Sequence, residues 1–163
     1  MTPEAQLIAT VELTAARFER SAATAELDPC VVIGGVLMAQ QAAVIALRAA
    51  GDSIPAQAGG TELLLRAASK DRLPAPFTLP FGATARQRFD RLVEARNSFM
   101  HPRGLTWHVS NETLSRGMPV ATKTVRHLIL TQPILNDLVS PSEQEKLADD
   151  LEQINACAEF LAA

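Results

Sequence analysis

The 163-residue chain contains no tyrosine, one tryptophan and only two cysteines. Cys30 and Cys157 lie within apolar helical patterns and lack the spacing of metal-ligand pairs, which favours buried, reduced thiols over a disulfide or a zinc site. No basic segment followed by an apolar core begins the sequence at Met1, so we expect no signal peptide. These absences predict a protein of a reducing compartment, the cytoplasm.

The sequence also lacks a convincing membrane span. Its longest apolar stretch, residues 30 to 47, carries Gly34-Gly35 and Gln40-Gln41 near the middle. A lipid-facing helix would have to bury those two amides in hydrocarbon. We therefore expect a buried core helix, with the two glycines permitting close helix packing, and no membrane partner.

The chain length and its 47% hydrophobic content fit a single domain over residues 1–163 with one well-buried core. Ala, Leu, Glu, Gln and Arg are plentiful, and β-branched residues occur mostly in short clusters, which favours helix. No internal repeat, linker or heptad run is present. The predicted fold is an all-α, up-and-down bundle of five or six helices.

Capping signals and apolar spacing predict the helix boundaries. Thr2, Asp28 and Ser140 each precede a proline at the first helical position, and Ser140 also forms a capping box with Glu143. Gly51 supplies a left-handed terminator. The expected helices begin at or near residues 2, 28, 61, 84, 119 and 140, and the first five end near residues 27, 50, 72, 101 and 132.

The remaining segments are predicted to be connections. Residues 73–82 contain three prolines and cannot form a regular helix, although their phenylalanines suggest that they pack onto the core. A short strand or an extended loop fits residues 105–110 equally well. In the fourth helix, the expected apolar face includes Phe89, Leu92 and either Phe99 or Met100.

The net charge of −3 is unevenly distributed. Residues 66–126 hold eleven basic and four acidic side chains, for +7, whereas residues 1–65 carry −4 and residues 127–163 carry −6. A positive segment within an acidic protein can concentrate a polyanion. The alternative is that these arginines pair with the acidic flanking helices.

The run from Arg96 to Pro102 combines a permanent cation, an amide and an imidazole at the end of the fourth helix. Arginine can grip a phosphate through two N–H bonds, and histidine can exchange protons near neutrality. Asn97 and His101 are four positions apart and should share one helix face. No histidine has a paired carboxylate at metal spacing, so we expect no metal and no cofactor.

Arg96, Asn97 and His101 give the chain a resemblance to the HEPN superfamily of small helical proteins. That family is known for a motif of arginine, a polar residue that is often asparagine, then a few residues and a histidine. Many members are metal-independent RNA endonucleases of toxin-antitoxin, defence or RNA-processing systems, and they commonly dimerise. The resemblance covers residues 1 to 139 as a topology and six residues as a motif.

The resemblance implies a catalytic role for each motif residue. His101 would be the acid or base at a ribose 2'-hydroxyl, Arg96 the clamp on the scissile phosphate, and Asn97 the positioning residue. We also expect Arg91 and Arg103 to bind substrate.

The implied partners are RNA, a second copy of the chain and, as a candidate, a separate antitoxin-type protein. The alternative function is a non-catalytic, dimeric helical module that binds a protein or a nucleotide.

Overall fold

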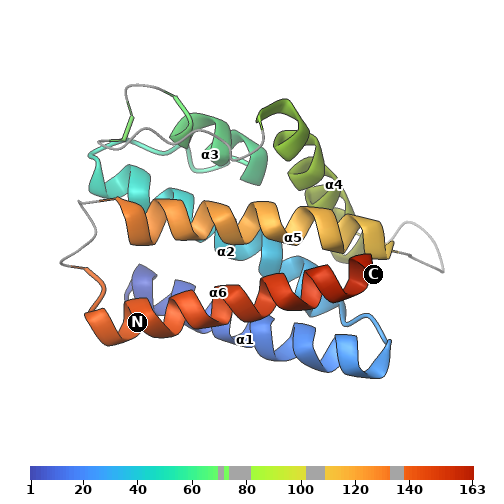
Figure 1. Cartoon of the computed structure of the whole chain (residues 1–163). Helices are drawn as coiled ribbons and strands as arrows, with labels where there is room; N and C mark the ends of the chain where they lie inside the picture. The colour runs from blue at the N-terminus through green and yellow to red at the C-terminus, as the bar shows by residue number, and fades with distance from the viewer. Residues whose placement is uncertain (70–71, 74–81, 102–108, 133–137) are drawn as a thin grey trace.

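The structure is a computed structural model that describes residues 1–69, 72–73, 82–101, 109–132 and 138–163. Within these ranges the chain forms six α-helices and one π-helix and contains no strand, which confirms the all-α bundle (Figure 1). The helices are α1 (Pro3–Thr24), α2 (Pro29–Ala49), α3 (Gly60–Ala67), α4 (Gly82–Met100), α5 (Asn111–Val125), the π-helix η1 (Arg126–Thr131) and α6 (Pro141–Ala162).

Four of the helices form a ring in which α1 packs on α2, α2 on α5, α5 on α6, and α6 on α1. The short α3 and the longer α4 lie outside this ring, against α2 and, for α4, also against α5 (Figure 1). The two sides of the bundle therefore differ. One side presents α4, and the opposite side presents α1 and α6.

Helix α2 is the most buried element because it has neighbours on several sides. By length and composition it could cross a membrane, but 67% of its most apolar window is buried inside the bundle. Gly34 and Gly35 lie where other helices come closest. A Cβ at position 34 would lie 2.1 Å from Thr14 Oγ1 on α1, and one at position 35 would lie 2.4 Å from Met118 Sδ on α5.

Local capping determines three helix starts as the sequence predicts. The Thr2 hydroxyl accepts a hydrogen bond from Ala5 N at 3.2 Å, and the Asp28 carboxylate accepts one from Cys30 N at 2.9 Å. Ser140 and Glu143 form the complete capping box. These side chains satisfy amide donors that the first helical turn leaves unpaired.

The prediction for α5 is wrong at its start. The helix begins at Asn111, after the N-cap Ser110, and contains Pro119 in its interior. Proline at the first helical position is common, but Ser110 provides a stronger start because its hydroxyl accepts a hydrogen bond from Thr113 N at 3.1 Å. The buried side chains of Leu114 and Met118 then hold the segment before Pro119 against the core.

Three other boundaries also differ from the prediction. Helix α1 ends at Thr24 because Ala25 adopts a left-handed conformation, with φ of 56°. Helix α3 ends at Ala67, where hydrogen bonds between close neighbours, including Ser69 N to Arg66 O, turn the chain. Helix α4 begins at Gly82, so Thr84 lies inside the helix instead of capping it.

Cys30 is exposed and not buried as predicted, because the first turn of α2 directs Val31 and Val32 into the core instead. Cys157 is partly buried, and both thiols are free. Phe99, not Met100, continues the apolar face of α4, since Met100 is 54% exposed. The predicted connection over 73–82 and the extended segment over 105–110 lie largely outside the described residues.

The contact between Gly34 and Thr14 leads to a stability prediction. Gly34→Ala should lower the free energy of unfolding by about 1–3 kcal/mol, because the methyl group would overlap the buried Thr14 side chain. Gly59→Ala is the control, since nothing lies within 4 Å of its Cβ position. Denaturant unfolding of both variants measures the difference. Equal stabilities would contradict the close packing of α1 on α2.

Candidate functional site

The candidate site lies on the second half of α4, which two glycine contacts hold against the ring. Gly117 on α5 allows a close approach, since a Cβ there would lie 3.2 Å from Leu92 Cβ and 3.3 Å from the Arg88 carbonyl oxygen. Leu92 also contacts the position of Gly35 on α2. The backbone that carries residues 96 to 101 is therefore fixed by packing one turn before the motif.

Asn97 and His101 lie on the outward face of α4, as their spacing predicts. Both are exposed, and the His101 amide donates to the Asn97 carbonyl oxygen at 2.9 Å, so the helical turn between them is intact. Because His101 is exposed, its imidazole projects into solvent at the end of the helix. The last helical turn also leaves carbonyl groups unpaired close to it.

Arg96 lies on a different face from His101. It continues the inward stripe of Ala85, Phe89 and Leu92, which are all buried. Five positions at 100° each place its Cα–Cβ direction about 140° around the helix from that of His101. Within a single chain, the structure therefore brings Asn97 and His101 together and turns Arg96 away from them.

The inward position leaves part of the Arg96 guanidinium without a partner. Its Nε atom is buried and makes no hydrogen bond among the described residues. A buried donor without an acceptor costs on the order of 1–3 kcal/mol. Bracing by a carboxylate, which is the structural alternative for this arginine, is not found in the described part of the chain.

Most of the other described basic residues of the segment from 66 to 126 do have acidic neighbours. Nine of its eleven basic residues lie in the described ranges, and five of them form ion pairs. These five are Arg66 and Arg72 with Asp52, Arg86 with Asp90, Arg116 with Glu112, and Arg126 with Glu152. Arg91, which is exposed, and Arg96 form no ion pair within the described ranges.

Asp52, which precedes α3 in the chain, binds two of these arginines. Its carboxylate accepts hydrogen bonds from Arg66 at 2.6 and 2.9 Å and from Arg72 at 2.9 Å. The Arg66 hydrogen bonds lower the pKa of Asp52 below its usual value, against a smaller opposing effect of burial. Part of the positive segment is thus neutralised locally, whereas Arg91 and Arg96 on α4 form no ion pair with any described residue.

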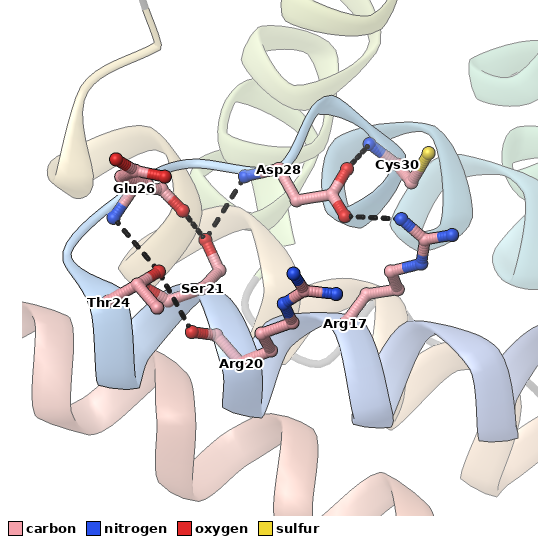
Figure 2. A network of polar contacts seen from close by, with 7 residues as sticks. All are labelled: Arg17, Arg20, Ser21, Thr24, Glu26, Asp28 and Cys30. Carbon is pink, nitrogen blue, oxygen red and sulfur yellow. Dashed lines mark hydrogen bonds and ion pairs between the residues drawn. The ribbon is translucent and has the colours of Figure 1, made fainter.

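A second polar cluster, at the turn between α1 and α2, was not predicted from sequence (Figure 2). Arg17 donates to the Asp28 carboxylate at 2.8 Å, and the Ser21 hydroxyl accepts from Asp28 N at 3.1 Å. The residues of this cluster line a hollow of about 270 Å³. Asp28 was recognisable as a helix cap, but its pairing with a residue eleven positions earlier depends on how α1 and α2 pack.

Arg103, the second predicted substrate contact, lies outside the described residues. Among the residues that are described, no group of three or more His, Cys, Asp or Glu side chains could hold a metal ion.

The chain matches no protein-family model, no curated protein and no solved structure.

Replacing Arg96 should stabilise the fold if its buried Nε is an unpaired donor and destabilise it if the arginine braces the fold. Arg96→Met should raise the free energy of unfolding by about 1 kcal/mol, because it keeps the packing stem and removes the unpaired donor. If Arg96 braced the fold, the same change would be destabilising. Arg91→Met, at an exposed position, is the control and should change stability by less than about 0.5 kcal/mol.

Asp52 gives a prediction for pH. Its folded pKa is lowered, so its stabilising effect is present above the pKa of the unfolded chain, about 4, and is lost as the pH falls through the folded value. Asp52→Asn should therefore lower the melting temperature at pH 7 and have a shrinking effect below pH of about 4. Glu145→Gln, at an exposed site, is the control. A constant difference at every pH would contradict the ion-pair assignment.

Proposed function

We propose that this chain is a HEPN-like, metal-independent protein that binds RNA and cleaves it at the end of α4. The observation that carries the proposal is that two arginines of α4, Arg91 in its middle and Arg96 near its end, have no carboxylate partner among the described residues. Asn97 and His101 are exposed at that end of the helix. Most ionised side chains that serve only structure find an opposite charge when partly buried. A phosphate would pair with the charge of the Arg96 guanidinium, which has no carboxylate partner among the described residues.

The chemistry needs only side chains from the end of α4, contributed by two copies of the chain. His101 takes the proton of a ribose 2'-hydroxyl, the 2'-oxygen attacks the adjacent phosphorus, and the 5'-oxygen leaves as its proton is returned by an imidazolium. The products are a 2',3'-cyclic phosphate and a 5'-hydroxyl. Arg96 stabilises the charge that develops on the phosphorane, and Asn97 orients the imidazole or the substrate.

A homodimer is part of the proposal. In one chain, Arg96 and His101 point to different faces of α4, so one phosphate cannot easily contact both. A second copy could place its own histidine opposite this arginine, as the resemblance to HEPN proteins implies. Two histidines would also supply the acid and the base of the reaction.

The inward position of Arg96 also favours the alternative function, a non-catalytic helical module that binds a protein or a nucleotide. In such a module the arginine stem would contribute packing, and His101 would need no role in proton transfer. The two functions differ in what His101→Ala does, because the exposed imidazole can be removed without disturbing the core.

Cleavage of RNA in EDTA tests the proposal. Purified protein should cut structured or unstructured RNA and leave a cyclic phosphate, and His101→Ala should reduce the rate by roughly 10²–10⁴-fold. Binding should weaken about tenfold in Arg91→Ala and Arg96→Met, since each removes a phosphate contact, and should depend strongly on salt. Arg48→Ala, an exposed arginine at the end of α2, is the control and should bind normally.

The results of these assays distinguish a nuclease, an RNA-binding protein and a helical interaction module. Equal cleavage by the wild type and His101→Ala would identify a contaminating nuclease and contradict catalysis. RNA binding that requires Arg91 and Arg96 without any cleavage would reduce the function to RNA binding. Neither cleavage nor binding would favour the interaction module.

A further inference from the structure

The side of the bundle opposite α4 carries an apolar groove between α1 and α6. The groove has a volume of about 350 Å³. Phe160, at one end, is 67% exposed, which is unusual for an aromatic side chain without a partner. The residues that line it are Glu19, Ala22 and Ala23 of α1 and Gln153, Ala156, Cys157 and Phe160 of α6.

One wall of this groove, helix α6, carries mostly acidic charge, and one acidic residue of α1 lines the groove. Helix α6 holds six carboxylates and one basic residue, Lys146, which is already bound to Glu12 of α1 at 2.7 Å. Asp149 is exposed and lies within about 20° of Phe160 around the helix axis. Glu19 lies in the groove itself, close enough to Cys157 that its charge adds to burial in raising the pKa of the thiol.

This charge pattern selects one kind of occupant. A second copy docked through the same face would bring two α6 helices with a large excess of carboxylates together, and like charges at an interface are unfavourable. An amphipathic helix with basic side chains beside its apolar stripe fits both features. Its apolar residues would cover Phe160 and the alanines, and its lysines or arginines would meet Glu19 and Asp149.

We propose that the groove between α1 and α6 is a docking site for a basic amphipathic helix of a partner protein. This inference is independent of the proposed RNA chemistry, because α4 packs on α2, α3 and α5 and lies on the other side of α2 and α5 from the groove (Figure 1). The two surfaces also differ in charge, which would keep RNA away from the groove.

Two synthetic helices serve as probes. The first is an 18-residue peptide with leucine and alanine on one face and lysine on the other, and the second has glutamate in place of every lysine. Fluorescence anisotropy with labelled peptides should show at least tenfold tighter binding of the lysine peptide, weakening with added salt. Equal binding of both peptides would overturn the proposal.

Two matched pairs of variants locate the binding. Glu19→Lys should weaken binding of the lysine peptide about tenfold, whereas Glu159→Lys, which changes the net charge equally on another face of α6, should not. Phe160→Ser should weaken it similarly, whereas Leu138→Ser, at an exposed apolar residue outside the groove, should not. Equal effects within either pair would mean non-specific attraction and would overturn the proposal.

The two cysteines provide an internal footprint. Bound peptide should slow alkylation of Cys157, which lines the groove, and leave the exposed Cys30 unaffected. Cys157 reactivity that does not change at saturating peptide would place the binding elsewhere. Sedimentation of the protein alone gives a further test, because a dimer that Phe160→Ser converts to monomer would show that a second copy occupies the groove.

Discussion

The close contact of α2 with its neighbours at Gly34 and Gly35 is the constraint on which the arrangement depends. Without side chains at these two positions, α2 can lie against Thr14 of α1 on one side and against Met118 of α5 on another. Leu92 of α4 reaches the same region, so the helix that carries the candidate site is positioned by it. A nearly all-apolar helix of this kind is stable in the interior because neighbouring helices cover it on several sides.

The candidate site depends on a compromise between stability and chemistry. Arg96 follows the core-facing stripe of α4, where an apolar residue would pack without leaving Nε unpaired. Proteins often retain such unfavourable groups where function requires them. The outward Asn97 and His101 carry no comparable cost, since water can solvate both side chains. Arg96 is therefore the residue at which folding and the proposed function conflict.

Features encoded by neighbouring residues could be predicted from the sequence, and features that depend on tertiary packing could not. The caps at Thr2, Asp28 and Ser140 and the shared face of Asn97 and His101 are local, and they were predicted correctly. The prediction that α5 begins at Pro119 is wrong because the N-cap is Ser110, nine residues earlier, and a lone serine is a common residue that does not by itself mark a helix start. The spacing of Arg96 from Phe89 and Leu92 is that of one helix face and indicates its inward direction, whereas the motif carries no information on which face the arginine takes.

The long-range polar contacts show the same limit. Asp52 binds Arg66 and Arg72 across a turn, and Asp28 binds Arg17 between two helices, with no sequence pattern that announces either pair. The uneven charge of the chain was visible in the sequence, but only the structure separates arginines with carboxylate partners from those without. The groove between α1 and α6 likewise arises from two helices that are more than a hundred residues apart in the chain.

The most direct measurement is an NMR titration of isotope-labelled protein with an uncleavable 2'-O-methyl RNA oligonucleotide. The account predicts that the guanidinium signals of Arg96 shift as the group meets a phosphate, together with the Asn97 amide and the His101 imidazole, while signals from α1 and α6 stay in place. If these three signals do not move at saturating RNA, or if the shifts occur only elsewhere, the end of α4 is not an RNA site.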